Sequence, residues 1–548
     1  MTSIASAAVI VVNSTDGDIK NDGACNLAEA IENANLDNTT HFECTTGAPG
    51  LDTIIFDLAG GSSSTQVTTG SEFGYTISSP IEIDGLSQGS DATCGVGDDF
   101  SDRDIDISLE DIRFVFNSGS AGSSIQGVSM GALSSVAVIE AQGSDGFTIR
   151  CSNIGMDSTG TSSIPGISTP VFINSGSSNI TLGGPGQEDR NLIAGGDSAP
   201  ESEAIIIYES SNITIQNNRI GSGSGLVPTL FPSSQEHIEI CGPSTCGGGW
   251  SQSSNISILD NEIQHATGTG MTIYGVINLF VERNLVSNNE GSGLEVGNVQ
   301  NSTIADNTIS GNGEYGLQLG GTNTQVSGNT FTNNGRGGLD ANIQTGSIAN
   351  NTVSENEEDG LRLIGNNLEI DDNIIFANGK SGLRIDSVDS ATIYGNYIGI
   401  DGVGDPYSNG VTITPDDSQA GLQISDSTNI IVGGLNPGER NIISGNDNEN
   451  ITAAIFIIPE FSGIFTPSSN IIIEGNYIGI AIDGVALLSN SGAGILSFGA
   501  DNVLIKNNLI HGGDLGVGLF SLRFPIILDN IAIVGNTIWG HNGAALNS

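Results

Sequence analysis

Basic side chains are scarce in this sequence of 548 residues, which has 14 Lys and Arg against 62 Asp and Glu and a formal net charge of −48. A field of that sign repels nucleic acids and anionic membranes, so neither is expected as a partner. The acidic excess instead favours bound Ca²⁺ or adaptation to a salty medium, because carboxylates bind hard cations and stay strongly hydrated.

Long apolar runs are also missing. No stretch reaches the roughly 20 residues that a membrane-spanning helix needs. Residues 1–12 are apolar, but no basic segment precedes them. We therefore interpret them as a first strand that remains after a signal peptide has been removed.

Familiar catalytic signatures are absent. The sequence has no HExxH motif, no GxSxG motif and no phosphate-binding loop. Its five His are scattered, and the Gly-His-Gly motif of a polygalacturonase-like hydrolase is missing. We interpret Asp371-Asp372 as a solvated turn pair. If the chain is an enzyme, a polysaccharide lyase is therefore favoured over a hydrolase.

A repeat of 22 or 23 residues runs through residues 256–398. In each repeat one Asn lies between two aliphatic residues, as Asn261 lies between Ile258 and Ile263. A fixed period in this range is typical of a solenoid. The aliphatic positions alternate with a period of two, so each repeat consists of short strands. The Asn of the seven repeats are Asn261, Asn284, Asn307, Asn329, Asn351, Asn373 and Asn396.

These columns predict that each repeat is one turn of a parallel β-helix. Equivalent positions of successive turns would lie ~4.8 Å apart, so aliphatic side chains stack into a continuous core. Buried Asn amides must be hydrogen-bonded, and stacked amides can bond to one another. The Gly of each Gly-Leu pair, such as Gly338-Leu339, is predicted to need a positive φ. The pattern resembles the right-handed parallel β-helix repeat proteins, whose architecture pectate lyases share.

The first part of the chain contains a helix signal. Asn26 stands three residues before a Glu, which is the spacing of a capping box, and apolar residues follow at helical intervals. Residues 25–31, Cys44 and residues 52–56 together resemble the CSLREA domain, which introduces β-helices in secreted bacterial and archaeal proteins. The sequence departs from that family at Asn26 and Ala28, where the family has Ser and Arg. The resemblance implies a short helix that covers the open first turn of the solenoid.

We therefore expect an all-β fold, a right-handed parallel β-helix solenoid with a short N-terminal capping helix. Residues 1–60 would form the strand and helix cap, and residues 61–548 the solenoid. No amphipathic cap follows the last turn, so we expect the full-length protein to continue beyond Ser548. Loops that interrupt such a coil often carry function. Three longer excursions are predicted, near residues 222–253, 402–419 and 447–469.

Six Cys without a CxxC pair are compatible with disulfides in an oxidising compartment, so we expect an extracellular or cell-surface location. A Cys25–Cys44 disulfide would tie the helix to the segment after it, and a Cys241–Cys246 disulfide would close a small surface loop. The remaining two Cys can pair with each other.

Asp16, Asp18 and Asp22 form a candidate calcium site, because acidic residues at alternate positions of a turn converge their oxygens. Their spacing fits no established motif, and a solvated acidic turn explains the same residues. Calcium is the one cofactor that the sequence suggests.

A charged cluster lies within residues 336–386. The residue after each Gly-Leu pair should point outward, which places Asp340, Arg362 and Arg384 on successive turns. Like charges in register are destabilising unless an anion or nearby carboxylates compensate them. Asp340, Glu358 and Asp386 are candidates for that compensation. If they do not compensate, the two Arg form an anion site.

A second column of the cluster stands two residues before the same glycines and alternates in sign. Arg336, Glu358 and Lys380 belong to it, and ion pairs between neighbouring turns explain the alternation. The candidate substrate-binding residues of the whole cluster are Arg336, Asp340, Glu358, Arg362 and Arg384.

Two functions fit these observations. The first is a non-catalytic extracellular or cell-surface module that presents a rigid face for glycan binding, adhesion or surface assembly. Its partners would be acidic or neutral polysaccharides or neighbouring surface proteins. The alternative is a uronate polysaccharide lyase, in which Lys380 or Arg384 removes the proton next to the carboxylate and Arg362 or Ca²⁺ neutralises that group.

Overall fold

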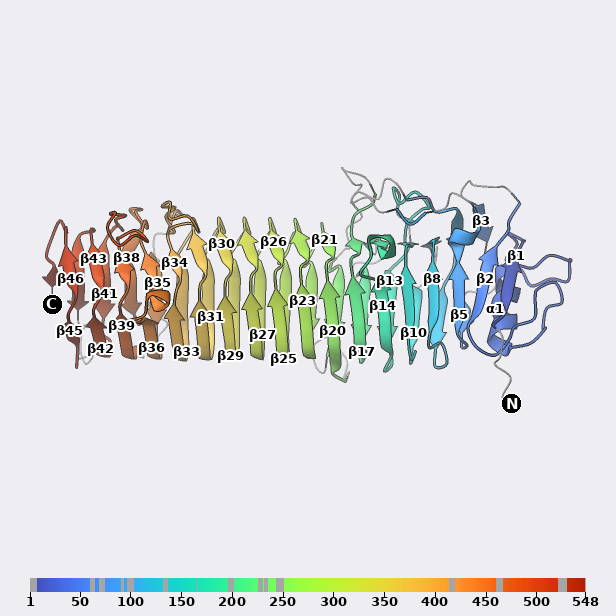
Figure 1. Cartoon of the computed structure of the whole chain (residues 1–548), viewed down its shortest axis with the longest axis horizontal. Helices are drawn as coiled ribbons and strands as arrows, with labels where there is room; N and C mark the ends of the chain where they lie inside the picture. Colours follow the sequence, from blue (N-terminus) through green and yellow to red (C-terminus); the bar gives the residue numbers. More distant parts are fainter. Residues whose placement is uncertain are drawn as a thin grey trace. The chain divides into compact units, whose positions relative to one another are not determined.

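A computed structural model describes most of the chain and divides it into two compact units, Met1–Gly291 and Ser292–Ser548. Parallel strands dominate both units (Figure 1). The described residues are 7–59, 65–68, 74–89, 93–95, 103–131, 137–164, 166–195, 202–224, 230, 235–242, 251–412, 419–459, 467–520 and 530–547. Parts of all three predicted excursions therefore lie outside the described residues. No helix among the described residues is long and apolar enough to span a membrane.

In the first unit, the strands pair in parallel with their equivalents on neighbouring turns. Thus β14 pairs with β11 and β17, while β15 pairs with β12 and β18. Three such strands complete one turn. The strands are β1 (Val9–Val12), β2 (Asp52–Phe56), β3 (Thr65–Thr68), β4 (Tyr75–Ile77), β5 (Ile81–Asp84), β6 (Ile107–Glu110), β7 (Phe114–Asn117), β8 (Ser123–Gln126), β9 (Val128–Gly131), β10 (Ala137–Gln142), β11 (Phe147–Arg150), β12 (Asn153–Ile154), β13 (Thr169–Asn174), β14 (Ser178–Gly183), β15 (Leu192–Ile193), β16 (Ile205–Tyr208), β17 (Ser211–Gln216), β18 (Arg219–Ile220), β19 (Ile238–Cys241), β20 (Ser253–Leu259), β21 (Glu262–Gln264), β22 (Met271–Tyr274), β23 (Val276–Glu282) and β24 (Leu285–Ser287).

In the second unit, the short repeats merge two strands of a turn into one long strand, because β33 pairs with both β35 and β36. The strands are β25 (Leu294–Ala305), β26 (Thr308–Ser310), β27 (Leu317–Ser327), β28 (Thr330–Thr332), β29 (Leu339–Ala349), β30 (Thr352–Ser354), β31 (Leu361–Asp371), β32 (Ile374–Phe376), β33 (Leu383–Tyr394), β34 (Tyr397–Ile398), β35 (Gln419–Ser425), β36 (Thr428–Gly433), β37 (Ile442–Ile443), β38 (Ile451–Ile458), β39 (Ser469–Glu474), β40 (Tyr477–Ile478), β41 (Ala493–Phe498), β42 (Asp501–Lys506), β43 (Leu509–His511), β44 (Leu515–Phe520), β45 (Ala532–Val534), β46 (Thr537–Trp539) and β47 (Leu546–Asn547).

The predicted aliphatic columns form the core of this unit. Leu317, Leu339, Leu361 and Leu383 pair in register on four successive turns, and each is at most 1% exposed. Because a strand alternates its side chains between two faces, the next residue along each strand faces outward. The all-β parallel β-helix predicted from the sequence is confirmed.

The Asn column is buried and bonded along the coil, as predicted. Within the second unit, the Nδ2 of Asn329 donates to the Oδ1 of Asn351 at 3.1 Å, and the main-chain N–H of Asn329 donates to the same oxygen at 2.9 Å. Asn351 bonds to Asn373 in the same way, at 2.9 and 3.0 Å. All three are 0% exposed. A second ladder, which the sequence analysis missed, joins Asn312, Asn334, Asn356, Asn378, Asn409, Asn446 and Asn490.

The prediction that the glycines of the Gly-Leu pairs need a positive φ is wrong. Gly338 and Gly360 do not have a positive φ, whereas the residue before the Asn of each of the seven repeats does, as Gly328 (φ 69°) and Asn350 (φ 57°) show. Gly is needed at these positions because the turns approach closely. A Cβ on Gly360 would lie 2.6 Å from the carbonyl oxygen of Gly382.

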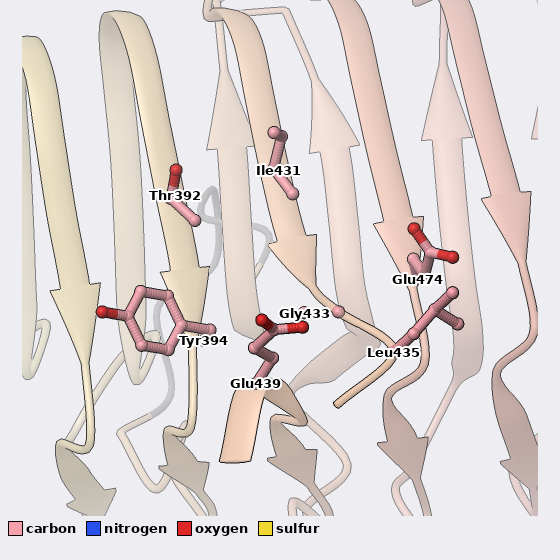
Figure 2. A pocket seen from close by; sticks show the side chains of 8 residues that line it. Thr392, Tyr394, Ile431, Gly433, Leu435, Glu439 and Glu474 are labelled. Atoms are coloured by element: carbon pink, nitrogen blue, oxygen red, sulfur yellow. The ribbon is translucent and has the colours of Figure 1, made fainter. Parts of the chain in front are cut away.

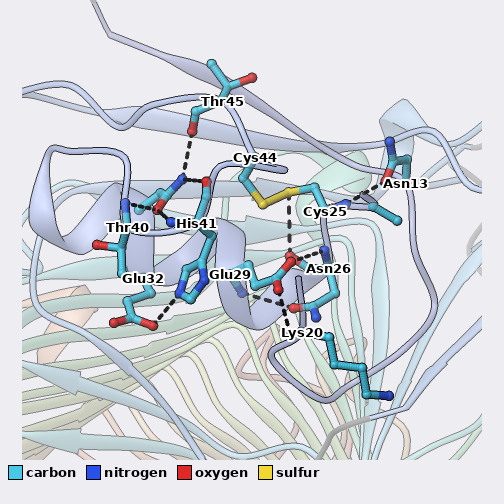
Figure 3. Close-up of a disulfide and its surroundings, with 12 residues drawn as sticks. Asn13, Lys20, Cys25, Asn26, Glu29, Glu32, Thr40, His41, Cys44 and Thr45 are labelled. Atoms are coloured by element: carbon cyan, nitrogen blue, oxygen red, sulfur yellow. Dashed lines mark hydrogen bonds and ion pairs between the residues drawn. A yellow bond between two sulfur atoms is a disulfide. The ribbon is translucent and has the colours of Figure 1, made fainter. Parts of the chain in front are cut away.

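The predicted helix is α1 (Leu27–Leu36), and the capping box is present at its N-terminus. Asn26 accepts from the N–H of Glu29 at 3.0 Å, and Glu29 accepts from the N–H of Asn26 at 3.2 Å. The helix packs against β1, β2, β4 and β5 of the first unit. The predicted Cys25–Cys44 disulfide is confirmed (Figure 3).

The two remaining Cys, Cys94 and Cys151, form the second disulfide. The predicted partner of Cys241 is Cys246, which lies outside the described residues. Two disulfides among the described residues agree with the oxidising compartment expected from the sequence.

Candidate functional site

The outward positions of β29, β31 and β33 bring together the residues that the sequence analysis singled out. Asp340 pairs in register with Arg362, and Arg362 with Arg384. We call these three residues and Asp386, two positions after Arg384, the charged column. Their side chains are partly or fully buried, with exposures of 21% for Asp340, 32% for Arg362, 20% for Arg384 and 4% for Asp386.

Carboxylates compensate the two stacked arginines. The Nη1 of Arg362 lies 3.2 Å from Asp340 Oδ1, and its Nε donates to Asp386 Oδ2 at 3.0 Å. The Nε of Arg384 donates to the same Asp386 oxygen at 2.7 Å. Burial alone would lower the pKa of Arg362, but Asp340 and Asp386 raise it. Arg362 is therefore a fixed positive charge.

Asp359 is a member of this cluster that the sequence analysis missed. The N–H of Ser381 donates to its Oδ1 at 2.9 Å, and Arg384 Nη1 lies 4.0 Å from its Oδ2. Burial raises the pKa of Asp359 to about 6, against the opposing effect of Arg384. A signal was present, because within the repeats of residues 256–398 Asp359 is the one acidic residue directly before the Gly of a Gly-Leu pair.

The second predicted column is also assembled. Lys380 Nζ lies 3.4 Å from Glu358 Oε1, which agrees with ion pairing between neighbouring turns. Arg336 instead lies over the ring of Tyr315, 5.5 Å from its centroid. Burial raises the pKa of Tyr315, with Asp340 and Glu358 adding to the effect. Electrostatic interactions join the two columns into one cluster, because Tyr315 interacts with Asp340 and Glu358, and Asp359 with Lys380 and Arg384. The candidate residues in this cluster are Arg336, Asp340, Glu358, Arg362, Lys380 and Arg384.

The ion pairs of this cluster hold Arg362, Arg384 and Lys380 in place as cations, which does not favour their use as catalytic bases. A lysine or arginine must lose its own proton before it can act as a base. Arg362 and Arg384 share Asp386, and Lys380 pairs with Glu358. Each carboxylate favours the cationic form of its partner. What the cluster offers is a set of fixed donors and acceptors on a rigid sheet.

The acidic turn near the N-terminus is compensated by a cation of the chain itself. Lys20 Nζ lies 2.6 Å from Asp16 and 3.5 Å from Asp18, while Asp22 accepts from the N–H of Ala24 at 3.0 Å. The hydrogen bond from Lys20 lowers the pKa of Asp16. Among the described residues, no group of three or more His, Cys, Asp or Glu is placed to hold a metal ion. Calcium binding stays a prediction.

An open groove that the sequence analysis did not predict lies farther along the same unit (Figure 2). Its side chains come from the ends of β33, β36 and β39 and from the segment after β36. Its volume is about 610 Å³. The lining residues are Thr392, Tyr394, Ile431, Gly433, Gly434, Leu435, Glu439 and Glu474.

Comparison with known proteins agrees with this architecture. A family model described as a right-handed β-helix region matches residues 115–342 and 246–398. No curated protein matches the sequence.

Several solved structures are similar in fold. The A-module of mannuronan C-5 epimerase AlgE6 of Azotobacter vinelandii is 14% identical, with 81% of this chain and 89% of that chain covered and a TM-score of 0.38. Tailspike protein 3 of bacteriophage CBA120 is 11% identical, with 76% and 56% covered and a TM-score of 0.37. Pectate lyase Pel9A is 15% identical, with 46% and 67% covered and a TM-score of 0.29.

Proposed function

This chain belongs to the family of right-handed β-helix proteins, and on that scaffold we propose an extracellular module that binds polysaccharide without cleaving it. The binding face includes the outward side of β29, β31 and β33. The observation that carries the proposal is the shared carboxylate of Asp386, which holds Arg362 and Arg384 in fixed positions.

Fixed positions suit a polymer. Successive turns repeat at ~4.8 Å, so the face presents hydrogen-bonding groups at a regular spacing, and a polysaccharide presents hydroxyls at a regular spacing of its own. Groups that are already ordered lose little conformational entropy when they bind. The strands around the charged column supply that order, because their core residues are almost fully buried.

The charge balance favours an uncharged polysaccharide over a uronate. Within the charged column, Asp340 and Asp386 offset the two arginines, so no net positive patch is left to capture a carboxylate. The chain as a whole carries −48, which repels a polyanion at low ionic strength. Sugar hydroxyls can both donate and accept, and they therefore match a face with mixed donors and acceptors.

The two disulfides support placing this activity outside the cytoplasm, because disulfides persist in oxidising compartments. A CSLREA-like role of α1 as the cap of the first turn belongs to the same proposal. Its support is the amphipathic helix and its capping box.

Retention of the purified protein on immobilised neutral and acidic polysaccharides tests the proposal. We expect retention on at least one neutral polymer and a loss of affinity of about tenfold in the double variant Arg362→Ala, Arg384→Ala. Arg283→Ala is the matched control, because Arg283 is a more exposed arginine that also lies in an ion pair, with Asp260.

Ultraviolet absorbance is followed in parallel with a panel of uronate polymers. Accumulation of unsaturated sugars that stops in the Arg384→Ala variant would replace this proposal with the lyase alternative. Absence of retention on every polymer would also contradict it.

A further inference from the structure

We propose that the groove is a subsite for a single uncharged sugar ring, which stacks on Tyr394 and donates hydroxyl hydrogens to Glu439 and Glu474. This inference rests on the proposed polysaccharide binding. It adds a location apart from the charged column and a class of sugar.

The groove spans three successive turns, and a glycine occupies the middle one. Gly433 pairs in register with Glu474, and Tyr394 stands one position beyond the pair of Ile393 with Val432. Tyr394 and Glu474 are therefore two turns apart, roughly 10 Å along the coil. Gly433 has a φ of +84°, and a Cβ there would meet the carbonyl oxygen of Glu474 at 2.2 Å. Gly433 therefore contributes only backbone to the lining of the groove, between Tyr394 on one neighbouring turn and Glu474 on the other.

Apolar side chains supply the contact surface. The hydroxyl of Tyr394 donates to Glu369 Oε1 at 2.5 Å, which fixes the ring in one orientation. Ile431 is 40% exposed and Leu435 is 64% exposed. Exposed apolar side chains beside a fixed aromatic ring match the C–H face of a pyranose, and Tyr provides such contact at low entropic cost.

The polar groups of the groove are hydrogen-bond acceptors. Glu439 accepts from the side chain and main chain of Asn436 at 2.7 and 3.1 Å, and the side-chain bond is the main reason that its pKa is lowered. Glu474 Oε2 lies 2.7 Å from Lys506 Nζ. Its Oε1 is buried and has no hydrogen-bond partner among the described residues. A buried acceptor without a donor is costly, and a ligand hydroxyl would satisfy it.

The surroundings exclude acidic sugars. Glu369 and Asp371 lie on β31, the turn next to Tyr394, and pair in register with Thr392 and Tyr394. Burial, followed by the charges of Asp372 and Glu369, raises the pKa of Asp371 to about 6. A uronate or sulfate group would meet this concentration of negative charge, whereas an uncharged ring would not.

Calorimetric titration with cellohexaose, mannohexaose, maltohexaose and trigalacturonate tests the subsite. We expect binding of at least one neutral hexamer and none of trigalacturonate. Tyr394→Ala should weaken that binding at least tenfold, whereas Tyr394→Phe keeps the stacking ring and should stay within about twofold of the wild type. The matched control is Tyr407→Ala, which removes a 48% exposed tyrosine of the same unit that does not line the groove.

The outcomes separate this inference from the proposed function. Retention on a neutral polymer with equal hexamer affinity in the wild type and the Tyr394→Ala variant overturns the subsite and leaves polysaccharide binding intact. Tighter binding of trigalacturonate than of any neutral hexamer overturns the sugar class. If the wild type binds no polymer and no hexamer, both proposals fail.

Discussion

Replacement of one ladder asparagine should destabilise the second unit strongly. Asn351 is fully buried, and its Oδ1 accepts from both the main-chain N–H and the Nδ2 of Asn329. Its own Nδ2 donates to Val326 O and to Asn373 Oδ1, each at 2.9 Å. Asn351→Ala deletes all four bonds. The N–H of Asn329 then has no acceptor, and two buried oxygens each lose a donor.

The magnitude follows from these orphaned groups. Each buried group left unsatisfied costs about 1–3 kcal/mol, and partial relaxation lets some of them find other partners. We therefore expect Asn351→Ala to lower the free energy of unfolding by about 2–5 kcal/mol. Turns of a solenoid contact mainly their neighbours, so the loss should be concentrated near this turn.

Urea unfolding and amide hydrogen exchange measure the effect. Asn342→Ala is the matched control, because Asn342 lies on β29 of the same turn but is exposed. This control should change stability by less than about 0.5 kcal/mol. Exchange of the Asn329 amide should accelerate only in Asn351→Ala. Equal urea midpoints for the two variants, with unchanged exchange at Asn329, would refute the ladder as a source of stability.

Three further predictions concern other parts of the chain. Because burial raises the pKa of Asp359 from 3.8 to about 6, this carboxyl favours folding most below pH 4, and its contribution is lost as pH rises through 6. Asp359→Asn should therefore stabilise the protein by about 1–3 kcal/mol at pH 7 and by much less at pH 4, as chemical unfolding at both pH values would reveal. Cys25→Ala with Cys44→Ala opens a crosslink between residues 19 positions apart and should cost the first unit about 2–4 kcal/mol, whereas an unchanged thermal melt would show that the packing of α1 is sufficient. Gly338→Ala places a Cβ 2.8 Å from a carbonyl oxygen of the next turn and should cost about 1–3 kcal/mol, which a melting curve identical to that of the wild type would contradict.

Because the repeat is regular, the buried residues of the core could be predicted from the sequence. A constant interval fixes the register, so the burial of Asn329 and the in-register pairing of Arg362 with Arg384 followed from counting. The same counting placed Asp386 near the two arginines, so compensation of their charge by Asp386 was one of the two alternatives predicted from the sequence. The need for glycine at Gly360 was recognised but misattributed, because a repeat length does not show that a Cβ there would lie 2.6 Å from the carbonyl oxygen of Gly382.

The groove could not be predicted for a different reason. Thr392 and Glu474 are 82 positions apart, and the turns between them carry two excursions that break the interval. Once the interval is broken, the register of Gly433 with Glu474 depends on where each lengthened turn rejoins the coil. The raised pKa of Asp359 likewise depends on burial, which sequence spacing does not report.

The second ladder tolerates very different lengths of chain between its rungs. Asn356 and Asn378 are 22 positions apart, Asn378 and Asn409 31, and Asn446 and Asn490 44, yet their side-chain bonds measure 2.9, 3.0 and 3.1 Å. Each connection is therefore free to grow or shrink while the asparagine at either end keeps its place. During evolution such a chain can gain, exchange or lose whole surface loops while the residues of its core stay the same. The same anchoring points offer natural positions for grafting foreign peptides onto a preformed scaffold.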